Sequence, residues 1–500
     1  MENMKSKPLK AKVFPSERII LAIMCMLATY NFMFQRLTIN FGLVCMVKSP
    51  SVANNSTPIN EMAHEIGDDQ AEFEWSRDVQ GLILASFYYG FVFAQIPGGW
   101  FSDRFGAKRA LIMSGFLVSI FTLFTPLAAR LGPNYLIGLR LAQGISNGAA
   151  MPAISTLSSR WFAALERGFM LGIAYSGFAF ATSTTYPIAA FFCENTGWPG
   201  LFYFAGIFGL LWCVATFFLI FEWPETHPRI GNEEIIFVQK YRAVQYTNAS
   251  NGPTNPQVIP WMKILFSVRV WALLISNFGC TWVFISIGMY LPTYTKEVLR
   301  QDISQNGILS AIPFVCTTIA HFLVAIAFDW IRKMNYCSVT VLRKGFNSLG
   351  AFGAALAMGL IGFVPSGNVL GPVVLITMGQ IFVEFAFTGG YVFSIFELAP
   401  KFAGTLTAIM NTFGFSVGLL SPPLVSYLTS NGRREDWLIF FNISAGICAL
   451  GGVFYVLFGT SELQDWAVTG RKSDNNNVQN VGSSKDEMIL IKDKENNSKK

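Results

Sequence analysis

Two arginines lie inside long apolar runs of this sequence. Arg36 falls in the run 19–47, within the stretch NFMFQRLTINF, and Arg140 falls in the run 135–157. A charged side chain at the centre of a bilayer costs at least about 2.5–3.5 kcal/mol, so it is tolerated mainly where it faces a cavity or a partner. The forked donors of a guanidinium group suit a carboxylate or a phosphate. Both arginines are therefore candidate ligands for a small anion.

The alternative for each arginine is that its long side chain reaches the membrane interface from within the run. Arg36 lies about eleven residues from the end of its run, which is roughly 16 Å along a helix. That depth favours the anion-binding interpretation. Arg140 lies only about one and a half turns from the end of its run, so the alternative is stronger there.

A glutamate and a histidine occupy comparable positions later in the chain. Glu384 stands in GQIFVEFAFTGGYVF and His321 in TTIAHFLVAIAF, both within apolar runs. Carboxyl and imidazole groups bind and release protons, and a carboxylate also attracts cations. Glu384 and His321 are therefore candidates for binding a coupling ion, Na+ or H+, and they could interact with each other. The alternative is that each side chain bonds a neighbouring helix and only stabilises packing.

The stretch GGWFSDRFGAKRA, residues 98–110, combines glycines with acidic and basic side chains at the end of an apolar run. A turn that contains glycine lets two helix ends approach closely. An acid can then face a helix N-terminus, while bases pair with acids or helix C-termini. Such contacts would gate one face; the alternative is a basic inner loop without a gating role. The predicted gating residues are Gly99, Asp103, Arg104, Gly106, Lys108 and Arg109.

The composition indicates an all-α membrane protein. Of the 500 residues 52% are hydrophobic and 13% are charged, and the mean hydropathy is +0.44. A soluble domain carries about 25% charged residues, so this chain has too few to cover a soluble surface. A helix needs about 20 apolar residues to cross the hydrocarbon core. Twelve runs approach or exceed that length: 19–47, 79–100, 110–129, 135–157, 168–192, 199–221, 270–294, 307–328, 345–364, 371–395, 403–428 and 437–458.

Lysines and arginines predict the orientation, because cytoplasmic segments carry an excess of them. Most of the 36 lie in segments on the same side as both chain ends, so both termini are predicted to be cytoplasmic. The predicted organisation is a cytoplasmic tail 1–18, a six-helix bundle 19–221, a connecting loop 222–269, a second six-helix bundle 270–466 and a disordered cytoplasmic tail 467–500.

Two short signals lie outside the runs. Asn54 and Asn55 begin overlapping glycosylation sequons in an acidic loop predicted to be external. The tail contains DEMILI, which resembles an acidic dileucine signal for lysosomal sorting, although such short patterns also arise by chance. Its residues are Asp486, Leu490 and Ile491. The sequence leaves plasma membrane and lysosomal or vesicular membrane open.

Other kinds of site are not indicated. Only Cys193 of the eight cysteines lies in a predicted outer loop, so disulfides are not expected to be the main stabilisation of the fold. No stretch resembles a catalytic triad, a metal site or a nucleotide-binding loop. The chain is therefore not expected to be an enzyme, to hold a cofactor or metal, or to bind nucleic acid.

Seven further stretches carry a resemblance to a known family: AQIPGGW (94–100), RLAQG (140–144), LERG (165–168), GWPGLFYFAGIFGLLW (197–212), PETHPRI (224–230), ELAPKFAG (397–404) and QDWA (464–467). With residues 98–110 they resemble the major facilitator superfamily, and within it the anion/cation symporters of solute carrier family seventeen. That family includes sialin, vesicular glutamate transporters and type I phosphate/urate transporters. The resemblance runs from about residue 18 to 467.

The resemblance implies twelve transmembrane helices in two six-helix bundles, with a small anion bound between them near mid-membrane. It also implies that Arg36 and Arg140 line the anion pathway. The stretch 98–110 matches the superfamily motif between the second and third helices. Members of the family are usually monomers, so a monomer in a lipid membrane is expected here.

The chain departs from the family at positions that bear on coupling. Where proton-coupled members carry glutamates on the fourth helix, this chain has Gln143 and Asn147, and Ser155 replaces a histidine. Proton symport through that helix is therefore in doubt, and the chain is closer to the phosphate/urate subgroup. Glu384 and His321 could compensate for the missing carboxylates.

These observations predict a secondary active transporter of small organic or inorganic anions that works by alternating access. The coupling would be to Na+, to H+ or to the membrane potential. One alternative is a voltage-driven anion uniporter in which Glu384 is only structural. Another is a non-transporting membrane sensor that keeps the transporter fold.

Overall fold

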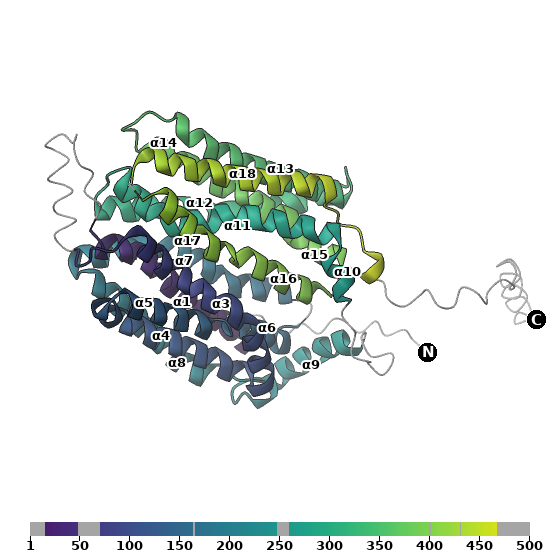
Figure 1. Ribbon diagram of the computed structural model, residues 1–500. Coiled ribbons are helices and arrows are strands. Elements are labelled where there is room, and N and C mark those ends of the chain that lie inside the picture. Colours follow the sequence, from purple (N-terminus) through teal and green to yellow (C-terminus); the bar gives the residue numbers. More distant parts are fainter. Residues whose placement is uncertain are drawn as a thin grey trace, which may run out of the picture.

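The structure is a computed structural model that describes residues 16–48, 71–163, 166–247, 260–399, 402–430 and 432–467. Within these ranges the chain is helical and forms no β-strand. The long helices lie side by side with roughly parallel axes (Figure 1). The predicted all-α membrane fold is confirmed, because these helices bury apolar faces against one another and expose others.

The helices fall into a first half, a connection and a second half. The first half contains α1 (Glu17–Met46), α3 (Arg77–Phe105), α4 (Ala107–Leu131), α5 (Pro133–Asn147), α6 (Ala150–Trp161), α7 (Arg167–Asn195) and α8 (Trp198–Leu219). The connection contains α9 (Asn232–Thr247) and α10 (Trp261–Leu265). The second half contains α11 (Val268–Glu297), α12 (Ile303–Lys333), α13 (Val339–Leu360), α14 (Leu370–Glu384), a π-helical segment (Phe385–Tyr391), α15 (Val392–Leu398), α16 (Ala403–Phe415), α17 (Val417–Leu428) and α18 (Arg434–Phe458).

Ten helical stretches of the described chain are long and apolar enough to cross a membrane. The other two predicted runs are also helical. The run 135–157 is divided into α5 and α6, whose 15 and 12 residues are each too short to be counted alone. The run 168–192 lies in α7, where the polar stretch ATSTTY lowers the hydropathy.

Polar residues and one glycine define where several helices begin. Ser16, Ser76, Asp302 and Ser338 each accept a hydrogen bond from a backbone N–H in the first turn of α1, α3, α12 and α13. Such caps satisfy donors that have no partner within the helix. Gly106 has a φ of 101°, which glycine adopts without strain, and it joins α3 directly to α4.

The two ends of the helix bundle differ, and we name each by a feature. At the disulfide face, Cys45 near the end of α1 is bonded to Cys193 near the end of α7, with their Cα atoms 6.3 Å apart. At the opposite α9 face, Arg18 of α1 pairs with Glu234 of α9, with Nε and Oε1 2.7 Å apart. The sequence did not predict the disulfide, because Cys45 lies within an apolar run.

The two halves lie on either side of a central plane, the first in purple to teal and the second in teal to yellow (Figure 1). They meet where α7 packs on α12, α3 on α17, and α1 on α11. Asn40 Nδ2 donates to Gly288 O at 3.2 Å, and the Tyr186 hydroxyl donates to the same oxygen. Lys296 Nζ donates to Val44 O at 2.8 Å. These polar contacts join the halves toward the disulfide face.

Candidate functional site

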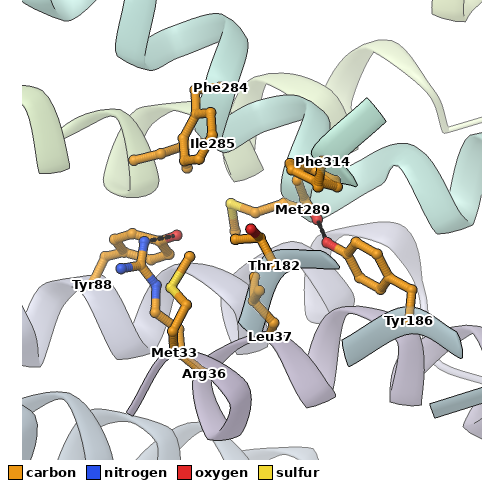
Figure 2. A pocket seen from close by; sticks show the side chains of 11 residues that line it. Met33, Arg36, Leu37, Tyr88, Thr182, Tyr186, Phe284, Ile285, Met289 and Phe314 are labelled. Carbon is orange, nitrogen blue, oxygen red and sulfur yellow. Dashed lines mark hydrogen bonds between the residues drawn. The ribbon is translucent and has the colours of Figure 1, made fainter. Parts of the chain in front are cut away.

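A small central cavity lies between the halves, and both contribute to its walls (Figure 2). Helices α1, α3 and α7 of the first half face α11 and α12 of the second. Arg36 and Tyr88 lie together on one wall, and Tyr186 lies on another. The lining is mostly apolar, and Arg36 supplies its charge. The lining residues are Met33, Arg36, Leu37, Tyr88, Thr182, Tyr186, Phe284, Ile285, Gly288, Met289 and Phe314.

The Arg36 side chain is held among aromatic rings. Its Nη2 donates to the Tyr88 hydroxyl at 2.5 Å. The guanidinium carbon lies 4.4 Å from the centre of the Tyr88 ring, 5.4 Å from that of Phe415 and 5.6 Å from that of Phe87. Aromatic faces attract cations, so these rings stabilise the charge without neutralising it. Phe415 belongs to α16, so both halves of the molecule contact Arg36.

Arg140 lies behind Phe87, one of the rings around Arg36, and is 3% exposed. Its guanidinium carbon is 5.0 Å from the centre of the Phe87 ring. Its Nη1 donates to Gln143 Oε1 at 2.8 Å, and Gln143 Nε2 donates to Thr122 Oγ1 at 3.1 Å. The Thr122 hydroxyl in turn donates to Gln35 Oε1 at 2.6 Å. A neutral hydrogen-bonded network therefore positions Arg140 where the family resemblance implies a carboxylate beside it.

The charges of the two arginines are not balanced by nearby acids. Among the residues that the structure describes, no carboxylate forms an ion pair with Arg36 or Arg140. The Nε atoms of both side chains are buried and have no hydrogen-bond partner there. A buried charge without a counter-ion is costly. The arrangement can therefore bind an anion that supplies the missing negative charge.

Glu384 and His321 lie side by side in the second half. His321 Nδ1 is 2.9 Å from Glu384 Oε2. Thr388 Oγ1 is 3.0 Å from that nitrogen and donates to Glu384 Oε2 at 3.1 Å. The side chain of Glu384 is 12% exposed and that of His321 is 45% exposed, so the protein does not seal this cluster. The sequence did not single out Thr388, although it follows Glu384 by one helical turn.

The backbone at this cluster is irregular. Glu384 ends α14, and the next seven residues form the π-helical segment, in which Gly390 has φ −105° and ψ −116°. Short π-helical segments occur often at functional sites. Arg343 of α13 donates to Gly389 O at 3.2 Å and pairs with Glu397 of α15, with Nη2 and Oε1 2.9 Å apart. This arginine therefore fastens the segment to the neighbouring helices.

Two helices connect the cluster of His321, Glu384 and Thr388 to the central cavity. Gln380, one turn before Glu384, donates from Nε2 to Val283 O at 3.4 Å. Val283 precedes Phe284 and Ile285, which line the cavity. On the other side, Ser183 and Thr318 place their hydroxyl oxygens 3.3 Å apart, so α7 contacts α12 one turn before His321. Residues one helical turn from the cluster therefore bond the helices that line the cavity.

Residues 19–422 match the Major Facilitator Superfamily. The chain belongs to this superfamily.

Curated relatives narrow the assignment to solute carrier family seventeen. The predicted resemblance of this chain to that family is confirmed. The chain is 32% identical to sialin of Ovis aries over 476 residues, which cover 93% of this chain and 94% of that protein. It is 31% identical to sodium-dependent phosphate transport protein 1 of Mus musculus, with 93% and 98% covered. It is 32% identical to vesicular glutamate transporter 2.1 of Danio rerio, with 87% and 74% covered.

Solved structures support the superfamily fold. A bacterial homologue of the human lysosomal transporter Spinster, in an inward-facing and unoccupied conformation, has a TM-score of 0.66 and 13% identity. The match covers 89% of this chain and 98% of that one. The inward-open xylose transporter XylE of E. coli has a TM-score of 0.62 and 17% identity, with 88% and 96% covered.

In this transporter the predicted gating stretch forms the turn between α3 and α4 on the α9 face. Gly99 and Arg104 lie in the last turns of α3, Gly106 forms the turn, and Lys108 and Arg109 begin α4. Arg104 and Arg109 are exposed. Asp103 lies in α3, but its side chain is outside the described part of the structure.

A glutamate that the sequence analysis did not select binds this turn. Glu222 Oε1 accepts from Ala107 N and Oε2 accepts from Lys108 N, both at 2.8 Å. Arg160 also pairs with Glu222. A carboxylate at a helix N-terminus is stabilised by the helix dipole. The available signal was an acid directly after the run 199–221, on the same predicted side as the motif.

The remaining predicted sites lie outside the described residues. These are the sequons at Asn54 and Asn55 and the sorting signal at Asp486, Leu490 and Ile491. The described part of the transporter contains no group of three or more His, Cys, Asp or Glu residues that could hold a metal ion.

Proposed function

We propose that this transporter moves a small organic or inorganic anion by alternating access, with Arg36 and Arg140 as its binding residues. The observation that carries the proposal is that the guanidinium group of Arg36 lines the central cavity and that of Arg140 lies behind Phe87, and that neither has a carboxylate partner in the described chain. Guanidinium groups suit carboxylates and phosphates, which agrees with the named cargoes of the phosphate and glutamate relatives. The cavity as it stands is smaller than such anions, so binding requires the halves to separate.

We further propose that the cluster of His321, Glu384 and Thr388 binds the coupling ion, and that this ion is H+. Sodium prefers a shell of oxygen ligands, as other hard cations do. Here the groups around Glu384 are one imidazole nitrogen at 2.9 Å and one hydroxyl at 3.1 Å. Imidazole and carboxyl groups instead exchange protons readily near neutral pH. A proton bound at His321 would convert its contact with Glu384 into an ion pair, and release of that proton would weaken the contact and let the π-helical segment move.

The test is uptake into proteoliposomes of labelled phosphate, urate, glutamate, aspartate and sialic acid. Each is measured with a pH gradient, a Na+ gradient or an imposed potential, for the wild type and Glu384→Gln. We expect a pH gradient to drive uptake in the wild type and not in the variant. Uptake driven by potential alone and unchanged in the variant would instead identify a uniporter with a structural Glu384. Binding of an anion without any flux would identify a sensor.

We propose that both termini are cytoplasmic and that the transporter acts as a monomer in the plasma membrane or a lysosomal or vesicular membrane. The basic segments on the α9 face support this orientation. Glycosylation at Asn54 or Asn55 would place the disulfide face outside the cytoplasm. Loss of lysosomal targeting in a Leu490→Ala, Ile491→Ala variant would distinguish the two locations.

A further inference from the structure

An ion pair joins the two halves at the disulfide face. Arg77 is the first residue of α3 and Glu297 is the last residue of α11, and their side chains form a direct ion pair. The side chains are only 12% and 9% exposed. Ser426 of α17 also donates its hydroxyl to Arg77 O at 2.9 Å. Separation of the halves at this face must therefore break a buried ion pair.

A second cavity adjoins Arg77. It lies between α1, α3, α11 and α17, and its polar walls include Asn40, Gln80, Tyr290 and Thr429 as well as Arg77. The Tyr290 hydroxyl and Arg77 Nε are buried, and neither has a hydrogen-bond partner among the described residues. Unsatisfied buried donors are rare because they are costly. Two such donors beside one cavity, one of them cationic, favour an anionic ligand.

This second cavity lies between the disulfide face and the central cavity. Arg77 and Tyr88 are both on α3, and their separation of about eleven residues corresponds to roughly 16 Å along the helix. Tyr88 is the residue that bonds Arg36. Asn40 lies one turn beyond Arg36 on α1. An anion that enters from the disulfide face therefore reaches Arg77 before it reaches Arg36.

We propose that Arg77, with Tyr290, is a first binding site for the transported anion, and that Glu297 occupies this site in place of the anion when the face is closed. When the halves separate, Arg77 leaves the Glu297 carboxylate and binds the carboxylate or phosphate group of the incoming anion. Removing one partner from a buried ion pair is strongly unfavourable, so an exchange of counter-ions keeps Arg77 paired in both states. This inference rests on the proposed anion transport.

The test compares two variants that both break the ion pair. Arg77→Gln and Glu297→Gln are each reconstituted in vesicles sorted so that the disulfide face is outside. The KM for entry from that face is measured with labelled phosphate, glutamate and sialic acid. A binding role for Arg77 predicts opposite shifts. We expect Arg77→Gln to raise the KM about tenfold, because a charged donor is lost, and Glu297→Gln to lower it severalfold, because a competitor is lost.

The controls distinguish a binding role of Arg77 from a purely structural ion pair, and they distinguish failure of this inference from failure of the proposed function. Glu74→Gln alters an exposed ion pair with Lys48 near the same face and should leave the KM unchanged. Arg77→Lys should recover part of the loss. If Arg77→Gln and Glu297→Gln shift the KM in the same direction, the pair is only a latch and the inference is wrong. If the wild type takes up none of the three anions, the proposed function fails and the inference fails with it.

Discussion

The fourth membrane segment of each half is interrupted at a corresponding place but carries different chemistry. In the first half, Gly148 follows Gln143 by five residues, and there α5 gives way to α6. In the second half, Gly389 follows Glu384 by five residues and lies in the π-helical segment. Both breaks lie just beyond a polar side chain that faces partners on neighbouring helices. Both halves therefore have an interrupted fourth membrane helix.

The side chains at the two breaks differ in charge. Gln143 is neutral and its side-chain oxygen accepts a hydrogen bond from Arg140, whereas Glu384 is acidic and contacts a histidine. A carboxylate at position 143 would lie in direct contact with Arg140 and would compete with the anion. Placing the acid in the second half leaves Arg140 available. The two halves therefore have the same kind of helix break, but the proposed anion site lies beside one break and the proposed proton site beside the other.

The largest expected effect comes from removing the charge of Arg140 in the first half. Arg140→Gln deletes the positive charge that the anion would neutralise, and hydrogen bonds to charged groups are worth about 1.5–3 kcal/mol. We expect kcat/KM for uptake to fall by about 100-fold, while the variant still folds. Initial-rate uptake and thermal unfolding in detergent measure both. Arg433→Gln, at a residue whose side chain is 62% exposed, should show no such loss, and equal losses in both variants would contradict the assignment.

A smaller effect is expected when the acid is moved into the first half. Gln143→Glu would place a carboxylate at the position now 2.8 Å from Arg140 Nη1. We expect the KM for the anion to rise about tenfold at neutral pH, because the new carboxylate neutralises Arg140. Acid pH should lower the KM again, since a protonated carboxyl no longer competes. A KM that does not depend on pH would show that Arg140 does not bind the anion.

The next effect concerns the second half alone. His321→Gln removes the imidazole that lies 2.9 Å from Glu384. We expect uptake driven by a pH gradient to fall about fivefold, because the imidazole that exchanges protons beside Glu384 is lost. The KM for the anion should not change. The measurement is the pH profile of uptake beside that of Glu384→Gln. A rise in the anion KM without a change in the profile would move His321 from coupling to anion binding.

The smallest effect is expected at Thr388. Thr388→Val keeps the shape of the side chain but removes the hydroxyl that contacts both His321 and Glu384. A typical side-chain hydrogen bond contributes about 1 kcal/mol net, so we expect a change of about threefold to fivefold in coupled uptake. Asn147→Ala tests the corresponding position of the first half. Because no hydrogen bond of the proposed proton site involves Asn147, that variant should retain its dependence on the pH gradient.

Much of this arrangement could be predicted from the sequence. Apolar runs predict helices well, because membrane crossing requires both length and hydropathy. An arginine within such a run is unusual enough to indicate a cavity, and Arg36 lines one. The proximity of Glu384 and His321 was suggested by the same reasoning together with the family fold.

Other features depend on contacts that the sequence pattern does not record. The neutral network of Thr122 and Gln35 behind Gln143 consists of common polar residues from different helices. Glu222 reaches the predicted gating turn only because α8 ends beside α4. Arg77 and Glu297 stand at helix ends, where charged residues are ordinary. Their pairing follows from the closure of the two halves.

The disulfide between Cys45 and Cys193 also bears on the proposed orientation of the transporter. Disulfides form and persist in oxidising compartments and are rare in the cytosol. The bond therefore fits the proposed orientation, in which the face that carries it is exposed to an oxidising lumen and the face with α9 stays in the cytosol. Redox chemistry thus supports the proposed orientation independently of the distribution of lysine and arginine.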